Sequence, residues 1–205
     1  MSKAVMLSVR PKWCEKIACG EKTIEVRKTR PKMGTPFKCY IYCTLPKYPH
    51  EDFIATNYPR PQFYGGGKVV GEFTCDRIDW ITHVGYTGIP DLVETRICDA
   101  ATMRTSPVGG LLNAACLTSK MLNDYLAWGD GYGWHITDLR IYDVPRELRE
   151  FWFPPEKYCV KELCGDCPHD QVADISCDYD SDCQWRRPLR RAPQSWCYVE
   201  EARDE

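Results

Sequence analysis

The chain of 205 residues has the length of one compact domain with a small appendage. Apolar residues make up 43% of it, which is enough to build a core and excludes a chain that is disordered throughout. The formal net charge of -2 excludes a strongly basic protein that coats nucleic acid, although a local basic site is compatible with this average.

The sequence also bears on the cellular location. It contains no run of about 20 apolar residues that could span a membrane, and the first residues, MSKAVMLSVRPKW, lack the apolar run of a signal peptide. We therefore expect a cytoplasmic protein. In that reducing compartment the 13 cysteines are expected to be free thiols or metal ligands rather than disulfides.

The first residues predict a strand, a helix and a second strand. The apolar run AVMLSV predicts a strand over residues 4–9, and Pro11 suits the first turn of a helix because its missing N–H costs nothing there. Gly20 stands where a left-handed residue ends many helices. A strand is then predicted over residues 23–28, and its alternation places Ile24 and Val26 on one face and Thr23, Glu25 and Arg27 on the other.

Two longer strands are predicted on either side of a loop. Residues 37–45 alternate, with an apolar face of Phe37, Cys39, Ile41 and Cys43 and a polar face of Lys38, Tyr40 and Tyr42. Residues 46–67 hold four prolines and three glycines, which predicts a surface loop. The second strand is predicted over residues 68–81, where Gly71 indicates a bulge or a close backbone approach.

The second half of the chain begins with a predicted helix over residues 119–127, capped by Thr118. Its apolar stripe consists of Met121, Leu122, Tyr125 and Leu126. A strand is predicted over residues 134–143, and a short helix is predicted to begin at Pro145.

Taken together, the mixed order of strands and helices predicts an α+β fold, a small β-barrel with two or three helices. We expect residues 1–153 to form the barrel domain and residues 154–193 to form a cysteine-rich insertion, possessing few aliphatic residues. Residues 194–205 are then expected to supply the closing strand of the barrel and a tail.

The stretch GEKTIEVRK, residues 20–28, brings acids and bases together at a helix end and on one strand face. Lys22, Glu25 and Arg27 could hold a polar ligand, since an arginine forks onto a phosphate and a carboxylate accepts an amino group such as that of cytosine. The alternative is an ordinary salt bridge on a solvated strand face.

These residues also carry a resemblance. LSVRPKWCEKIACGEKTIEVRK resembles the N-terminal signature of the ASCH family, whose fold is a PUA-like β-barrel. The family pattern Gly-x-Lys-x-x-Glu-x-Arg is matched by Gly20, Lys22, Glu25 and Arg27. Looser matches are VVGEF, GYGWHITDL and APQSWCYV, so the resemblance covers roughly residues 7–143 and 193–199.

The resemblance implies a cleft that binds RNA or a modified nucleoside. One branch of similar domains is an amidohydrolase that deacetylates acetylated cytidine with a Thr, a Lys and a Glu; Lys22 matches that Lys and Glu72 matches that Glu. Glu25 occupies the position of the nucleophilic Thr, a departure that favours binding. The alternative is a hydrolase, an amidohydrolase or a ribonuclease, in which Lys22, Glu25 and Glu72 are catalytic.

Further residues are candidates for contacts with such a ligand. Ser8 and Arg10 precede the first helix and are placed to contact a phosphate. Trp134 is either an aromatic that stacks on an unpaired base or a core residue. The polar-face tyrosines of the strand over residues 37–45 could line the same groove, and one dense basic run, RRPLRR, consists of Arg186, Arg187, Arg190 and Arg191.

The cysteine-rich segment suggests a metal. Cys164 and Cys167 have the spacing at which two thiolates reach one tetrahedral zinc ion. We expect Cys177 and Cys183 to complete a structural site, with Cys159 or His169 as substitutes, because a segment with few aliphatic residues cannot build its own core. The alternatives are unliganded thiols, or a zinc-stabilised domain that contacts proteins and has neither activity nor affinity for nucleic acid.

Overall fold

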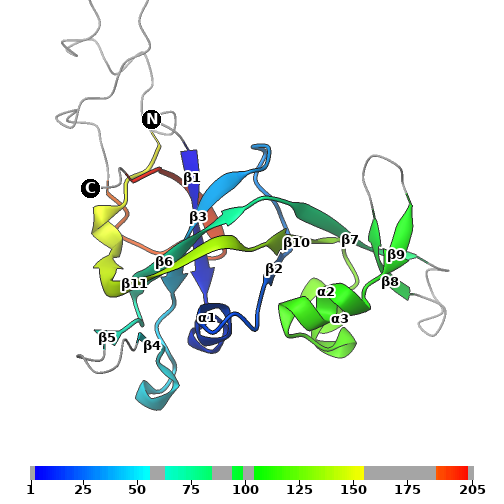
Figure 1. The fold of residues 1–205 in the computed structure, drawn as a ribbon, viewed down its shortest axis with the longest axis horizontal. Coiled ribbons are helices and arrows are strands. Elements are labelled where there is room, and N and C mark those ends of the chain that lie inside the picture. Colours follow the sequence, from blue (N-terminus) through cyan, green and yellow to red (C-terminus); the bar gives the residue numbers. More distant parts are fainter. Residues whose placement is uncertain (1–2, 56–62, 85–93, 99–103, 155–187, 203–205) are drawn as a thin grey trace, which may run out of the picture.

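The described part of the chain contains two five-stranded sheets and three α-helices (Figure 1). The structure is a computed structural model and describes residues 3–55, 63–84, 94–98, 104–154 and 188–202. In the first sheet the strands follow the order β11 (Thr137–Glu147), β6 (Lys68–Cys75), β3 (Phe37–Cys43), β1 (Lys3–Val9) and β12 (Trp196–Glu200). The second sheet has the order β2 (Ile24–Arg27), β10 (Gly131–His135), β7 (Ile78–Val84), β8 (Glu94–Cys98) and β9 (Thr105–Pro107).

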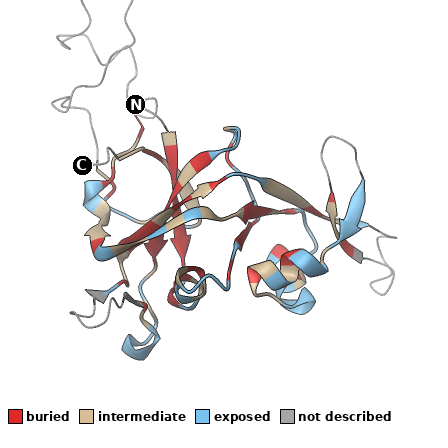
Figure 2. Ribbon diagram, in the orientation of Figure 1, coloured by how far each residue is buried: buried red, intermediate tan, exposed pale blue. Residues whose placement is uncertain are grey.

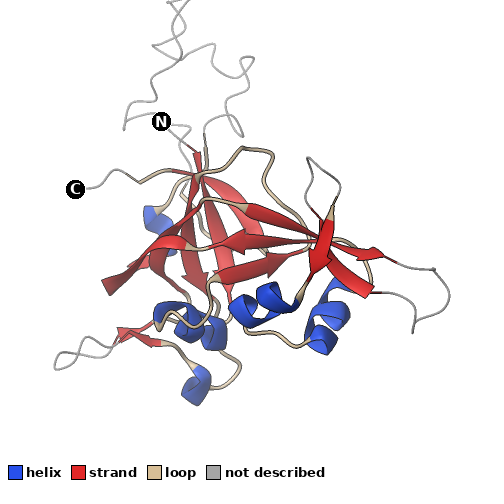
Figure 3. Cartoon of the chain, turned by 45° about the vertical axis from the view of Figure 1, so that its right-hand side comes forward, coloured by secondary structure: helices blue, strands red, loops and turns tan. Residues whose placement is uncertain are grey.

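The α-helices lie in the lower part of the views in Figures 1 and 3. They are α1 (Pro11–Ala18), α2 (Gly109–Ala115) and α3 (Ser119–Leu126), with short 3-10 turns η1 (Pro49–Glu51) and η3 (Leu148–Glu150) and a two-stranded ribbon of β4 (Ile54–Ala55) and β5 (Phe63–Tyr64). None of the helices in the described ranges is long and apolar enough to cross a membrane.

This architecture agrees with the predicted mixture of a mainly β fold and a few helices. All neighbours in the first sheet pair antiparallel except β1 and β3, which are parallel. The hydrogen-bonded ladders between the described strands form two open sheets, so the closed barrel is not confirmed. Of the cysteine-rich insertion predicted over residues 154–193, residues 155–187 lie outside the described residues.

The main core lies where the two sheets meet, and buried residues concentrate in β1 and β3 (Figure 2). Trp134 of the second sheet packs edge-on against Phe37 of the first, with ring centroids 5.8 Å apart. Because the first sheet also packs on its other face, around Tyr40 and Phe151, both faces of β3 are buried. The prediction that Tyr40 and Tyr42 line a groove is therefore wrong: their exposed fractions are 0% and 8%.

A third apolar cluster joins the second sheet to α2 and α3. Ile24 and Val26 pack there with Leu111, Leu122 and Leu126. Thr118 caps α3 as predicted, since its Oγ1 accepts a hydrogen bond from the backbone N–H of the third helical residue. The predicted alternation of the strand over residues 23–28 is confirmed, because the side chains at positions 24 and 26 face this cluster.

Three predicted elements differ from those in the structure. The strand predicted over residues 68–81 is divided into β6 and β7, and the one predicted over 134–143 is divided into β10 and β11. The helix predicted from Pro145 is wrong: β11 runs on to Glu147, followed by a single 3-10 turn. Pro145 is accepted because β11 is an edge strand and its register shifts between Ile141 and Arg146.

Gly71 confirms the predicted close backbone approach. A Cβ atom at this position would lie 2.5 Å from the carbonyl oxygen of Arg140 in the neighbouring strand. We expect Gly71→Ala to destabilise the fold by about 1–3 kcal/mol because β6 and β11 must separate to admit the methyl group. The matched control is Gly34→Ala, where a Cβ meets nothing within 4 Å. Thermal melts that show equal losses in both variants would contradict the expectation.

Candidate functional site: a buried ion triad in a cationic cleft

A buried carboxylate between two cations is the centre of the candidate site. The Glu25 side chain lies 3.2 Å from Lys22 Nζ through Oε2 and 3.0 Å from Arg27 Nη2 through Oε1. The three side chains, which we call the ion triad, are only 2%, 9% and 9% exposed for Lys22, Glu25 and Arg27. Such burial distinguishes the triad from the solvated salt bridge that the sequence left as an alternative.

The local sequence explains how the triad forms. Helix α1 ends before Gly20, whose φ of +79° confirms the predicted left-handed residue. The chain then turns back, and the N–H of Lys22 donates to the carbonyl of Lys16 over 2.8 Å. Since Ile24 and Val26 are buried against α2 and α3, Glu25 and Arg27 must face the opposite side of β2, toward Lys22.

Backbone carbonyls hold both cations in place. Lys22 Nζ donates to the carbonyl of Ala115 over 2.8 Å, and Arg27 Nη2 donates to the carbonyl of Ser8 over 2.6 Å. Arg27 Nη1 also lies 3.4 Å from Ser195 Oγ, so the arginine connects β2 to β1 and to the residue that precedes β12. Its buried Nε has no hydrogen-bond partner among the described residues.

The ion triad borders a cleft of about 420 Å³, a volume in the range of small-molecule sites. Four cationic side chains line this cleft against one carboxylate, since Arg10 and Lys12 join the triad. The cleft is therefore cationic overall. Its lining residues are Ser8, Val9, Arg10, Lys12, Trp13, Lys22, Glu25, Val26, Arg27, Thr44, Leu117, Met121, Tyr125, Gln194 and Ser195.

Five of the sequence-predicted site residues meet in this cleft, namely Ser8, Arg10, Lys22, Glu25 and Arg27. Arg10 is exposed, whereas Ser8 is buried and its hydroxyl donates to the carbonyl of Pro193 over 2.6 Å. The hydroxyl of Ser8 is thus already engaged within the protein.

Trp134 is a core residue rather than a stacking surface. Its exposed fraction is 0%, and its ring packs against Phe37 and Trp196. The strand register places it directly opposite Glu25, on the neighbouring strand β2. The expectation that an exposed Trp134 stacks on a base is therefore corrected by its burial.

The cleft has other aromatic residues that the sequence did not single out as site residues. Tyr125 and Met121 were assigned to the apolar stripe of α3, but only Leu122 and Leu126 of that stripe are buried. Tyr125 is 41% exposed and lines the cleft, and Trp13 of α1 lies with its ring centroid 5.0 Å from Lys22 Nζ. The sequence signal for this was the spacing within the stripe. Met121 and Tyr125 are four residues apart and share one face of α3, whereas Leu122 and Leu126 share the neighbouring face that is buried.

Glu72 is not among the residues that line the cleft. Its Oε2 accepts a hydrogen bond of 2.6 Å from Tyr142 Oη, and its Oε1 lies 3.8 Å from Lys38 Nζ. Glu72 pairs in register with Tyr40, so it faces the second core cluster instead. The structure therefore does not bring the two carboxylates Glu25 and Glu72 together.

Burial disfavours the ionised form of two groups near Glu25. It raises the pKa of the Cys14 thiol well above its ordinary value, and the neighbouring Cys43 adds to this shift. Burial also raises the pKa of Tyr125, where the charge of Glu25 acts in the same direction and that of Arg27 opposes it. Neither group is therefore activated as a nucleophile near neutral pH.

The predicted zinc ligands Cys164, Cys167, Cys177 and Cys183 lie outside the described residues. The described ranges themselves contain no group of three His, Cys, Asp or Glu side chains that could hold a metal ion. Of the basic run, only Arg190 and Arg191 are described, and both are exposed.

Comparison with solved structures finds ASCH proteins, as the sequence resemblance suggested. The crystal structure of ASCH from Zymomonas mobilis is 15% identical, with a TM-score of 0.48, and the match covers 97% of this chain and 88% of that one. Two point variants of the Zymomonas protein give the same identity and TM-score and cover 98% and 97% of this chain, and 92% and 89% of their own. No family model and no curated protein matches the chain.

The ion triad predicts a stability effect that an exposed strand face would not show. Glu25→Gln keeps the shape of the side chain but leaves Lys22 and Arg27 buried without their shared counter-charge. We expect a loss of about 3–5 kcal/mol in the free energy of unfolding, measured by urea denaturation. The matched control is Glu21→Gln, which removes the exposed partner of Lys16 and should leave the midpoint nearly unchanged. Equal midpoints for both variants would contradict the buried triad.

Proposed function

We propose that the cleft binds a nucleotide of RNA or a modified nucleoside, and that the protein is a binding module. The observation that carries the proposal is the buried Glu25 carboxylate, held between two cations inside a cationic cleft. A carboxylate fixed in this way accepts hydrogen bonds from an exocyclic amino group on a base edge. The two flanking cations, 3.2 Å and 3.0 Å away, fix the position of its two oxygens.

The charge at the mouth of the cleft supports a phosphorylated ligand. Arg10 and Lys12 are exposed residues that line it, and they stand at the N-cap and at the second helical position of α1. Guanidinium and ammonium groups are the side chains that bind phosphates in proteins. Tyr125 of α3 also lines the cleft and offers a partly exposed ring on which a base can stack. A nucleotide therefore matches both the acidic centre and the basic rim.

Hydrolysis is the alternative, and the described residues support it less. Glu72 contacts Tyr142 and Lys38 rather than the ion triad, and Lys22 is engaged by Glu25 and a backbone carbonyl. A hydrolase would need a nucleophile or an activated water beside these groups. Release of acetate from acetylated cytidine, lost in Lys22→Met, would establish the enzyme in place of the binding module.

The binding proposal predicts a preference among nucleotides. In isothermal titration calorimetry we expect cytidine monophosphate to bind more tightly than uridine monophosphate, by about 5-fold or more, because only cytosine presents an amino group to Glu25. It should also bind more tightly than unphosphorylated cytidine, and Arg10→Ala should remove that second difference.

The matched control for Arg10→Ala is Lys68→Ala. Lys68 is a cation on β6 that pairs with Glu147 of β11, and it is not among the residues that line the cleft. The affinity of this control variant for cytidine monophosphate should equal that of the unaltered protein. If none of the three ligands binds at millimolar concentration, the proposed function fails.

We also propose that Cys164, Cys167, Cys177 and Cys183 hold one structural zinc ion, an arrangement that leaves no position open for water. The proposal rests on the spacing of the cysteines and on the small number of aliphatic residues around them. Elemental analysis of the purified protein should find about one zinc per chain, and Cys164→Ser should lower this content. Cys19→Ser, at an exposed free thiol of the described region, is the control. A zinc content near zero in the unaltered protein would contradict the proposal.

A further inference from the structure

A second concavity, of about 930 Å³, lies on the second sheet outside the cleft. It is formed by strands β7, β8, β9 and β10 and by the segment that follows β2. It shares no lining residue with the cleft. Its lining residues are Arg30, Arg77, Ile78, Asp79, Trp80, Ile97, Cys98, Arg104, Thr105, Ser106 and Tyr132.

The strand register connects this concavity to the cleft. Arg27 of the ion triad is opposite Tyr132 on β10, and Tyr132 is opposite Trp80 on β7. Residues opposite each other in neighbouring strands point to the same face of a sheet, and neighbouring strands are about 4.8 Å apart. Tyr132 and Trp80, which we call the aromatic row, therefore continue outward from the edge of the cleft.

Only one face of this sheet is available for a ligand over most of its width. The face that carries Ile24, Val26 and Ile81 is covered by α2 and α3, which lie against it in Figure 1. Tyr132 and Trp80 belong to the other face and are partly exposed. The aromatic row is thus accessible, in contrast to the buried Trp134 two residues further along β10.

The charges around the aromatic row are mainly positive. Arg30, Arg77 and Arg104 line the concavity against the single carboxylate of Asp79. The Arg30 guanidinium lies 5.6 Å from the centre of the Tyr132 ring, within the range of a cation–π contact. Arg77 is 66% exposed although its Nε lies 3.3 Å from Asp79 Oδ1.

We propose that this concavity binds the unpaired nucleotides of a single-stranded RNA whose neighbouring nucleotide occupies the cleft. Proteins that bind single strands without sequence preference stack the bases on aromatic rings and contact the phosphates with surrounding arginines. Tyr132 and Trp80 supply the stacking, and the arginines supply the phosphate contacts. The continuity with the cleft rests on the proposed function, whereas the aromatic row and its charges stand independently of it.

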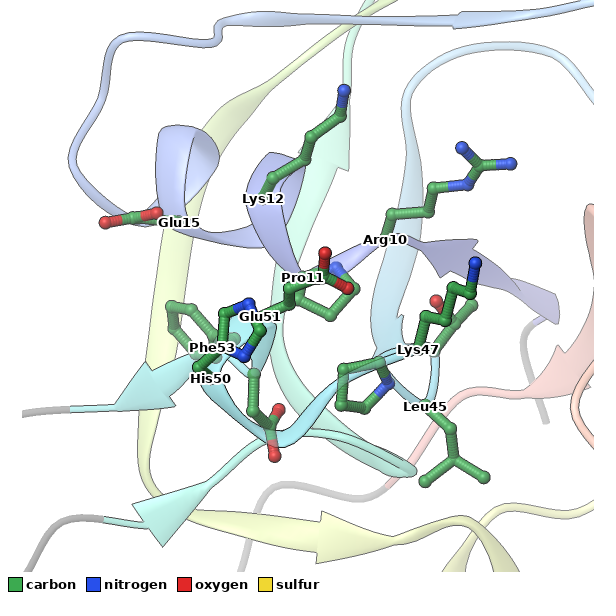
Figure 4. Close-up of a pocket in the computed structure, with 12 residues that line it drawn as sticks. Arg10, Pro11, Lys12, Glu15, Leu45, Lys47, His50, Glu51 and Phe53 are labelled. Carbon is green, nitrogen blue, oxygen red and sulfur yellow. The ribbon is translucent and has the colours of Figure 1, made fainter.

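The other large concavity, of about 970 Å³, fits this role less well (Figure 4). It adjoins the cleft through Arg10, Lys12 and Thr44, but the cations Arg10, Lys12 and Lys47 meet as many carboxylates there, those of Glu15, Glu51 and Asp52. Balanced charge gives no attraction for a phosphate backbone. The cationic, aromatic concavity on the second sheet is therefore the better path for the strand.

The test compares a short RNA with a mononucleotide. We expect a cytidine-containing single strand of about ten nucleotides to bind more tightly than cytidine monophosphate. Fluorescence anisotropy measures the binding of the RNA. Trp80→Ala and Tyr132→Ala should each weaken RNA binding by about 5- to 150-fold and leave the affinity for cytidine monophosphate unchanged. Trp80→Phe, which keeps a ring, should restore most of the loss and guards against misfolding of the alanine variant.

Two controls separate stacking and charge from general effects. Trp128→Ala removes a tryptophan that is 55% exposed but does not line the concavity, and RNA binding should not change. Arg104→Gln should reduce the slope of log affinity against log salt by about 0.7, as expected for one phosphate contact of a single strand. Arg149→Gln, on the turn η3, should leave the slope unchanged.

The outcomes distinguish this inference from the proposed function. If cytidine monophosphate binds but the RNA binds no more tightly, or if Trp80→Ala and Tyr132→Ala bind RNA like the unaltered protein, the inference is overturned and the cleft stands. If the RNA binds through the aromatic row while no mononucleotide binds, the proposed function is overturned and the inference stands.

Discussion

The Glu25 carboxylate, shared by Lys22 and Arg27 away from solvent, is the interaction on which the site depends. A buried ion pair adds little net stability because removing charges from water is costly, but losing one member leaves an uncompensated buried charge. Replacing any one of the three side chains is therefore expected to destabilise the fold. It also joins the end of α1 to β2 and, through the hydrogen bonds of Arg27, to Ser8 and Ser195.

The ion triad also decides how a loss of binding in a variant must be interpreted. If these side chains lay in solvent, replacing them would affect a ligand and leave the fold intact. Their burial couples the two, so Glu25→Gln is expected to change stability as well as recognition. Exposed residues at the mouth, such as Arg10, report on the ligand alone because no buried charge depends on them. They are the better probes of function.

Much of the fold follows from local patterns. The wrong predictions share one cause, which is packing or pairing with distant segments. The strand periodicity of residues 23–28, the cap of α3 and the close approach at Gly71 are each predicted from a local pattern, and all three are confirmed. The tyrosines of β3 were assigned to a polar face because alternation alone cannot tell that a sheet is covered on both sides. The helix at Pro145 was replaced by an edge strand because pairing with β6 outweighs a local preference.

The sequence by itself determined the charged centre of the candidate site: the spacing of Gly20, Lys22, Glu25 and Arg27 places a turn before a strand and sets the two strand residues on one face. Tertiary structure alone decided that this face is buried, that Tyr125 lines the cleft and that Glu72 does not. It also aligned Arg27, Tyr132 and Trp80 from three separate strands. Such neighbours are set by strand pairing between distant segments, and periodicity within one segment carries no information about it.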